Sequence, residues 1–191
     1  VNNTLYKSSI STSFGGVNPY NNTYIGNTMT EGSSMTTQPG SIVYNNNVTG
    51  ALTLGKENTA YNNTVGKAMT VKDNSLAYEN TVGELKVTAK NSIVKNNQIN
   101  GAVNIAKAAT NTTFANNTAK GTVTVLSNNN VITGNMIETT GDYAIDLKTT
   151  ENNTIKNNIL IANNKTGNDA VNGNMSKNNA EGNADKKVII T

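Results

Sequence analysis

Apolar and polar residues alternate over short runs throughout the chain. In each run two apolar residues flank a single polar residue, and a glycine or asparagine stands a few positions away. This alternation has the period of two that is typical of a half-buried β-strand. We therefore predict many short strands whose apolar side chains point inward. The predicted inward pairs are Leu52/Leu54, Met69/Val71, Leu85/Val87, Val103/Ile105, Val123/Val125 and Ile145/Leu147.

The strand-like runs return at a fixed interval, which decides the architecture. Between residues 41 and 101 the chain repeats one unit four times. Tyr44, Tyr61 and Tyr78 mark the same position 17 residues apart, and Lys95 takes the next place. A unit of this length is too short for a helical hairpin, and it contains two strand-like runs. Each unit therefore predicts one coil of a β-solenoid.

Asparagine occupies one position of nearly every unit. At a corner that turns inward, each Asn side chain can donate to and accept from the Asn of the next coil, and this amide ladder offsets its burial. Glycines precede the second strand of successive units, and we expect them to form corners with positive φ. The predicted ladder comprises Asn27, Asn46, Asn63, Asn80, Asn97, Asn117, Asn135, Asn158 and Asn179. The predicted corner glycines are Gly50, Gly66, Gly83, Gly101 and Gly121.

These patterns predict an all-β fold, a single-stranded parallel β-helix over residues 1–184 with a separate C-terminal strand at 185–191. At about 4.8 Å per coil, some eight to ten coils would form a rod on the order of 40–50 Å long. The mean hydropathy of −0.46 would by itself favour disorder. However, Val, Ile, Leu and Met recur at the repeat interval. A solenoid also needs few apolar residues, because each coil buries its inward side chains against its neighbours.

Segments such as NNTIKNNIL (152–160), TGDYAIDL (140–147) and TGNDAVNG (166–173) resemble the repeats of the parallel β-helix repeat family. The resemblance extends from about residue 4 to residue 180, and the Asn/Thr-rich character is similar to that of adhesin-like surface proteins of methanogenic archaea. This resemblance implies a right-handed parallel β-helix that is secreted or displayed at the cell surface.

Charge and composition exclude several classes of function. The net charge is +3 with lysines scattered singly, so no basic patch indicates a nucleic-acid partner. No apolar run approaches the roughly 18 residues of a membrane helix, so we expect no membrane insertion. The chain has no Cys or His, which excludes disulfides and thiolate chemistry. We expect no cofactor.

The three repeated tyrosines are candidate binding residues. We expect Tyr44, Tyr61 and Tyr78 to point outward and to stack on one another. Such a row could bind surface glycans, because aromatic faces pack on the apolar C–H patches of sugars. Alternatively, the rings stack only to fix the strand register.

Acidic residues are too sparse to predict an enzyme. Asp142 and Asp146, if stacked near Asn168 and Asn172, form a weak candidate for a Ca²⁺ site, and the alternative is a solvated loop. A polysaccharide lyase on this fold would usually need an arginine base, and a hydrolase needs paired carboxylates. The chain contains no Arg or His, so we predict a non-enzymatic protein.

At the ends of a β-helix the strand edges are unpaired, and unpaired edges favour association. The tail at 185–191 ends in the β-branched residues Val188, Ile189 and Ile190, which could close the rod or pair with a second subunit. We therefore predict an extracellular structural protein, either a head-to-tail filament or sheath subunit or an adhesin-like stalk. The alternative is a carbohydrate-binding or polysaccharide-degrading β-helix protein.

Overall fold

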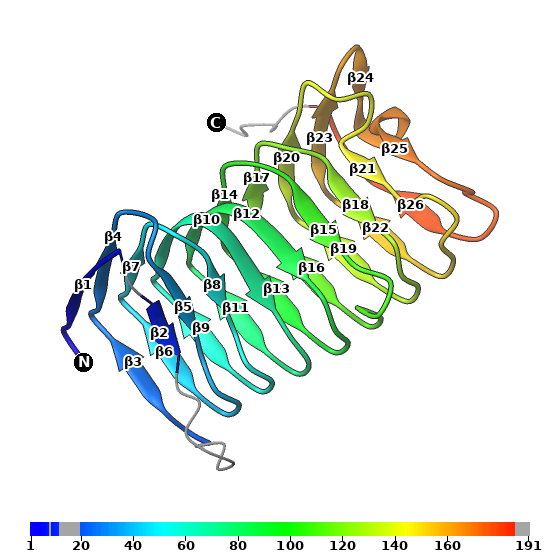
Figure 1. Ribbon diagram of the computed structural model, residues 1–191. Helices are drawn as coiled ribbons and strands as arrows, with labels where there is room; N and C mark the ends of the chain where they lie inside the picture. Colours follow the sequence, from blue (N-terminus) through cyan, green and yellow to red (C-terminus); the bar gives the residue numbers. More distant parts are fainter. Residues whose placement is uncertain (8, 12–19, 186–191) are drawn as a thin grey trace, which may run out of the picture.

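The computed structural model describes residues 1–7, 9–11 and 20–185, and these residues wind into a parallel β-solenoid (Figure 1). Strands of successive coils pair in parallel, and β1 and β26, the first and last described strands, lie toward opposite ends of the rod. The predicted all-β solenoid is therefore confirmed. The predicted C-terminal strand with Val188, Ile189 and Ile190 lies outside the described residues.

Each coil contributes strands to three faces. Face 1 is a nine-stranded sheet with one strand per coil, which falls within the predicted range of coils. Its strands are β3 (Thr23–Ile25), β6 (Ile42–Tyr44), β9 (Thr59–Tyr61), β11 (Leu76–Tyr78), β13 (Ile93–Lys95), β16 (Thr113–Ala115), β19 (Val131–Thr133), β22 (Thr154–Lys156) and β26 (Asn179–Glu181).

Faces 2 and 3 belong to one 17-stranded sheet. The two faces are joined because β10 (Thr64–Val71) and β12 (Thr81–Val87) each run around the corner between them without a break. Face 2 also contains β1 (Thr4–Tyr6), β4 (Thr28–Thr30), β7 (Asn47–Val48), β14 (Gln98–Ile99), β17 (Thr118–Ala119), β20 (Met136–Glu138) and β23 (Ile159–Ala162). Face 3 also contains β2 (Ser9–Ser11), β5 (Ser34–Thr36), β8 (Leu52–Thr53), β15 (Val103–Ile105), β18 (Val123–Val125), β21 (Ile145–Asp146) and β25 (Val171–Asn172).

The core is a continuous apolar column along the axis of the rod. On face 1, Val43, Ala60 and Ala77 pair in register, and all three are fully buried. The six predicted inward pairs on face 3 are buried as well, because the period of two turns every second side chain inward. Phe114 is the largest of the fully buried side chains. Few apolar residues suffice because each inward side chain contacts its equivalents in the coils on both sides.

At two of the three corners, a residue with positive φ, in the left-handed region of backbone conformation, directly precedes a buried polar residue. Asn62 has a φ of 53° and precedes buried Asn63, whereas Glu57 has a φ of 57° and precedes buried Asn58. Asparagine tolerates this region better than most residues, which explains the many Asn-Asn pairs. At the corner between faces 1 and 2 the left-handed residues are Asn2, Gly26, Asn45, Asn62, Glu79, Asn96, Asn116, Gly134, Asn157 and Gly182. At the corner between faces 3 and 1 they are Asn21, Gly40, Glu57, Asn74, Asn91, Asn111, Asn129 and Asn152.

The glycines at the third corner have a different role from the predicted one. None of Gly50, Gly66, Gly83, Gly101 and Gly121 has a positive φ, so that prediction is wrong. A Cβ on Gly83 would instead lie 2.5 Å from the carbonyl oxygen of Gly66 in the preceding coil, and one on Gly66 would lie 2.6 Å from that of Thr49. Glycine is therefore needed here because the backbones of neighbouring coils approach too closely for any side chain.

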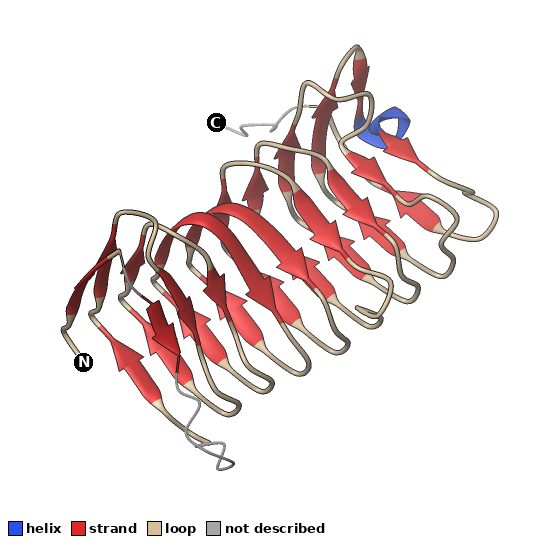
Figure 2. Ribbon diagram, in the orientation of Figure 1, coloured by secondary structure: helices blue, strands red, loops and turns tan. Residues whose placement is uncertain are grey.

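The C-terminal end carries an insertion that departs from the repeat. After β23 the chain turns back as β24 (Lys165–Thr166), which pairs antiparallel with β23, and continues into the short 3-10 helix η1 (Gly167–Ala170). This is the only helix among the described residues (Figure 2). The Nζ of Lys165 lies 3.6 Å from the ring centroid of Tyr143 and holds the hairpin against the preceding loop. We call residues 163–170 the cap.

Candidate functional site

The predicted asparagine ladder is present at the corner between faces 1 and 2, and we call it the first ladder. In a typical rung the backbone N–H and the side-chain amide of Asn63 both donate to Oδ1 of Asn80, at 3.0 and 2.9 Å. The same amide also donates to the backbone oxygens of Val43 and Tyr61. Each buried rung is therefore fully hydrogen-bonded, which removes the cost of burying an amide in an apolar column.

The first ladder is longer than predicted, and its last member differs. Asn158 donates to Oδ1 of Asn183, not of Asn179. Asn179 is exposed in β26 and pairs with Thr154 on face 1. The prediction for Asn179 is wrong because the cap lengthens this coil. At the other end Asn3 donates to Asn27. The ladder thus comprises Asn3, Asn27, Asn46, Asn63, Asn80, Asn97, Asn117, Asn135, Asn158 and Asn183.

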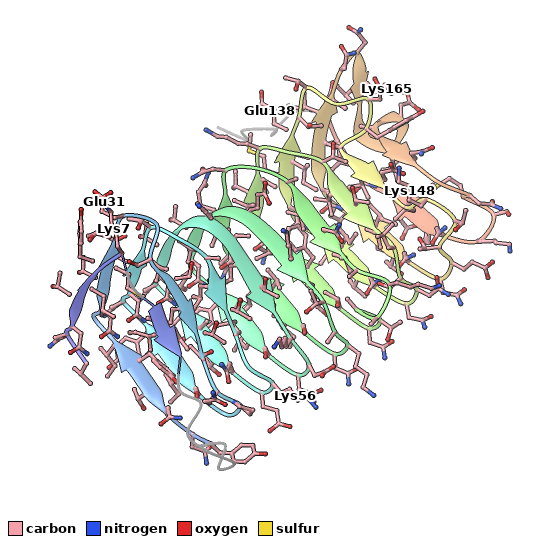
Figure 3. The ribbon with its side chains drawn as sticks, viewed as in Figure 1. Lys7, Glu31, Lys56, Glu138, Lys148 and Lys165 are labelled. Atoms are coloured by element: carbon pink, nitrogen blue, oxygen red, sulfur yellow. The ribbon has the colours of Figure 1, made fainter. Side chains whose placement is uncertain are left out.

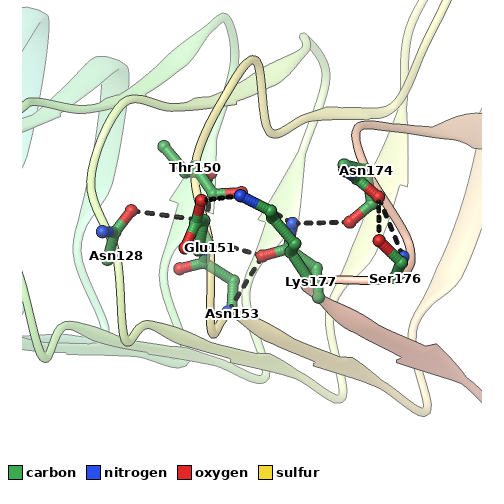
Figure 4. A network of polar contacts seen from close by, with 8 residues as sticks. Asn128, Thr150, Glu151, Asn153, Asn174, Ser176 and Lys177 are labelled. Carbon is green, nitrogen blue, oxygen red and sulfur yellow. Dashed lines mark hydrogen bonds and ion pairs between the residues drawn. The ribbon is translucent and has the colours of Figure 1, made fainter.

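A second polar column, which sequence reasoning missed, lies at the corner between faces 3 and 1. Near the C-terminal end it is again an amide ladder, since Asn130 donates to Asn153 and Asn153 to Asn178, each at 3.0 Å. Figure 4 shows the surroundings of Asn153. Nearby, Lys177 pairs with Glu151 on the surface. The column consists of Asn22, Ser41, Asn58, Ser75, Ser92, Thr112, Asn130, Asn153 and Asn178. Hydroxyl groups replace amides in the middle of the rod.

The tyrosines form an outward stack on face 1, as predicted. The ring centroids of Tyr44 and Tyr61 are 4.9 Å apart, those of Tyr61 and Tyr78 are 5.1 Å apart, and the rings are nearly parallel. The Nζ of Lys95 lies 5.8 Å from the ring of Tyr78. Burial between its neighbours, together with the charges of Tyr44 and Tyr78, raises the pKa of Tyr61. Both faces of Tyr61 are covered, so the stack offers ring edges to a sugar and favours the role of fixing strand register.

The predicted acidic residues lie around a hollow of about 340 Å³ on the C-terminal third of face 3, which we call the Tyr143 hollow. Its lining residues are Thr122, Asp142, Tyr143, Asp146, Lys148 and Asn172. The carboxylate of Asp146 accepts from Nζ of Lys148 at 2.5 Å and from Nδ2 of Asn172 at 3.0 Å. Partial burial acts to raise the pKa of Asp146, but these hydrogen bonds and the charge of Lys148 outweigh it, so the pKa is lowered.

This arrangement does not favour the predicted Ca²⁺ site. Asn172 turns its N–H toward Asp146 and not its oxygen, and the ammonium of Lys148 already neutralises the carboxylate. Asn168, the other proposed oxygen donor, accepts instead from Asn183. Within the described part of the chain, no three His, Cys, Asp or Glu residues lie close enough to hold a metal ion.

A second hollow, of about 550 Å³, follows the glycine corner between faces 2 and 3. Its residues are Ala51, Gly66, Lys67, Ala68, Gly83, Glu84, Lys86 and Gly101. The hollow exists because the glycines at this corner have no side chains to fill it. Glu31 and Glu138 lie along the same edge of the rod, toward its two ends (Figure 3). Glu84 and Lys86 are exposed and 4.0 Å apart. Close stacking of the coils explains this hollow without a ligand.

The two ends of the rod differ in chemistry from its sides. Among the described residues, β3 pairs only with β6 and β26 only with β22. Strand edges of this kind can accept a further strand. The sides, in contrast, have their backbone groups engaged between coils.

Comparison with family models, with curated proteins and with solved structures finds no match for this chain. None of the helical segments described is long and apolar enough to cross a membrane.

Proposed function

We propose that this protein is a non-enzymatic, extracellular structural protein, a stiff β-solenoid that serves as a subunit of a surface filament or sheath or as an adhesin-like stalk. Its Asn/Thr-rich repeats resemble those of the adhesin-like surface proteins of methanogenic archaea, and this resemblance supports a location outside the cell. Second copies of the chain are the proposed partner.

The observation that carries the proposal is the continuity of the first ladder. From Asn3 to Asn183 each rung is tied to the next by amide hydrogen bonds, in parallel with the backbone bonds between coils. All these bonds run along the axis, so a pull on the two ends of the rod is shared by many bonds at once. Such a molecule is suited to bearing load or to holding two surfaces apart.

Negative-stain microscopy combined with sedimentation velocity tests the proposal. We expect the full chain to form straight rods, with end-to-end fibres if it is a filament subunit and separate rods if it is a stalk. Deletion of residues 185–191 should abolish the fibres if that tail joins subunits. Particles without a rod shape at any concentration would contradict the proposal.

The extracellular location needs a separate test. Protease treatment of intact cells of the source organism should release peptides of this protein before any cytoplasmic marker appears. Peptides that appear only after lysis would contradict the proposed location, whatever the shape of the molecule.

The Tyr143 hollow supports a second candidate function, the binding of a carbohydrate. It combines an aromatic ring with the carboxylate of Asp146 and the amide of Asn172, and sugar sites commonly combine apolar surface with a few polar groups. Affinity electrophoresis in gels that contain a soluble polysaccharide would detect such binding. Retardation that Tyr143→Ala removes, and that Tyr20→Ala on the exposed surface leaves intact, would support this candidate. Equal mobility in all gels would contradict it.

A further inference from the structure

Four asparagines at the two corners with positive φ share one local arrangement. Asn62, for example, is exposed and has a φ of 53°, and it directly precedes buried Asn63 and outward-facing Thr64. It is therefore the first residue of an Asn-x-Thr sequence, which is the acceptor motif for N-linked glycans. The four exposed asparagines of this kind are Asn21, Asn62, Asn116 and Asn152, with φ between 53° and 59°.

The side-chain amides of the four residues are available for modification. N-linked glycosylation attaches a sugar to Nδ2, so this atom has to be accessible and not engaged elsewhere. Within the described part of the chain, Nδ2 of none of the four donates a hydrogen bond. In contrast, Asn91 is followed by Ser92 and Ile93 and donates from Nδ2 to Oδ1 of Asn74 at 3.1 Å. The corner asparagine Asn111 starts an Asn-x-Thr sequence too, but its Nδ2 donates to Asn91 at 3.3 Å, so it is not one of the four.

At two of the sites the next coil leaves open space beside the amide. Gly40 and Gly134 occupy the positions equivalent to Asn21 and Asn116 one coil further along. A Cβ on either glycine would lie 2.3 Å from Oδ1 of the corresponding asparagine. The glycines therefore keep other side chains away from these two amides.

The spacing of the sites along each corner also suits a bulky substituent. Asn62 and Asn116 lie at the corner between faces 1 and 2, where the coils of Glu79 and Asn96 separate them. Asn21 and Asn152 lie far apart at the corner between faces 3 and 1. Strands of adjacent coils are only about 4.8 Å apart, which is less than the width of a sugar ring. None of the four sites has a second one in an adjacent coil of its corner.

We propose that Asn21, Asn62, Asn116 and Asn152 carry N-linked glycans, in one row along each edge of face 1. The donor is a sugar activated as a phosphate ester of a carrier. The bond from Nδ2 to the anomeric carbon forms, the bond from that carbon to the phosphate oxygen breaks, and the phosphate leaves with the electron pair while Nδ2 gives up a proton. The inference rests on the extracellular location in the proposed function, because such motifs are modified in exported proteins.

Glycans in these two rows shield face 1. One outward column of this face includes Ile42, Ile93 and Val131, which are 44%, 44% and 38% exposed. Exposed apolar surface of this kind favours association. Sugar chains along both edges of the face hold the sides of neighbouring rods apart.

Peptide mass spectrometry of the protein purified from its source organism tests the four sites. We expect a sugar mass on each of them and none on Asn96, which has the same corner geometry with a φ of 57° but is followed by Asn97 and Gln98. Four unmodified asparagines in protein found at the cell surface would refute this inference, while the proposed function would stand. Unmodified asparagines in protein found only inside the cell would refute both.

Secretion of the full chain from yeast tests the motif itself. Thr118→Val removes the acceptor sequence of Asn116 without changing the asparagine, and we expect the loss of one glycan mass. Gln98→Thr added to Thr118→Val should restore one glycan, now on Asn96. The matched control Thr124→Val, on the outward side of β18, should leave the mass unchanged. Thermal melting checks that each variant is folded. An unchanged mass in Thr118→Val would refute modification of Asn116.

Electron microscopy tests the shielding of face 1. The same chain produced without glycans in a bacterial cytoplasm should form side-by-side bundles more often than the secreted rods at equal concentration. Unglycosylated rods that stay as separate as the secreted ones would refute the shielding role.

Discussion

Nδ2 of Asn80 donates at 3.0 Å to Oδ1 of Asn97, the equivalent residue one coil further along the chain. Both side chains are buried. Because the same contact repeats from coil to coil, each amide is a donor for one neighbour and an acceptor for the other. The stability of one rung therefore depends on the rungs on both sides.

Replacing a central rung should destabilise the rod strongly. Asn80→Leu removes the oxygen that accepts from both the backbone N–H and the amide of Asn63. Each donor left buried without a partner costs roughly 1–3 kcal/mol, so we expect the free energy of unfolding to fall by at least that amount in urea titration. Asn104→Leu, on an exposed position of β15, is the control. Equal losses in the two variants would contradict the role of the ladder.

The glycine corner provides a second prediction. Gly83→Ala places a methyl group 2.5 Å from the carbonyl oxygen of Gly66, and overpacking of this kind typically costs about 1–3 kcal/mol. The melting temperature should fall accordingly. Gly32→Asn is the control, because a Cβ there meets no atom within 4 Å and Asn tolerates its φ of 77°. An unchanged melting temperature for Gly83→Ala would show that the coils can move apart at little cost.

The alternation of residues such as Leu52 and Leu54 around Thr53 was sufficient to predict the strands. The fixed repeat interval predicted the parallel stack, and the asparagine recurring in each unit predicted most of the first ladder. Inward and outward positions follow from the period of two, and the constant step between equivalent residues follows from the stacking of coils. Where the coils have the same length, the residues that stack on one another can therefore be identified from the sequence alone.

Three features of the rod were not predicted correctly from the sequence. The second polar column was missed because Ser75, Thr112 and Asn130 occupy equivalent positions in it although they are different residue types. Their step along the chain matches that of the first ladder and could have revealed them. Asn179 was chosen over Asn183 because the cap changes the step of the last coil. An isolated glycine can indicate either positive φ or close backbone approach, and only the position of Gly66 against Gly83 decides between them.

The pair between Asp146 and Lys148 should make part of the stability dependent on pH. The pKa of Asp146 is lowered in the folded protein from its ordinary value of 3.8, so the unfolded chain takes up a proton at a higher pH than the folded one. This contribution is fully present above that value and is lost as the pH falls through the folded pKa. Melting temperatures measured from pH 6 down to about pH 2 should show a smaller decline for Asp146→Asn than for the unchanged protein. Parallel curves would contradict this assignment.

The corner at Glu79 offers a stabilising substitution. Glu79 has a φ of 54°, whereas the equivalent positions in the neighbouring coils are held by Asn62 and Asn96 with φ of 53° and 57°. Most L-residues lose roughly 1–2 kcal/mol in this region, and Asn loses less because its side chain bonds locally. We therefore expect Glu79→Asn to increase the free energy of unfolding by about 0.5–1 kcal/mol in urea titration.

Glu84→Asn separates this backbone effect from the loss of a negative charge. Glu84 is also exposed and lies nearby in β12, but its φ is not positive, and its contact with Lys86 at 4.0 Å lies at the surface. A surface change of this kind should stay within about 0.5 kcal/mol of the unchanged protein. If Glu84→Asn stabilised the rod as much as Glu79→Asn, the gain would come from charge. If only Glu79→Asn stabilised the rod, the gain would come from the backbone at the corner, where a residue of positive φ directly precedes each asparagine of the first ladder.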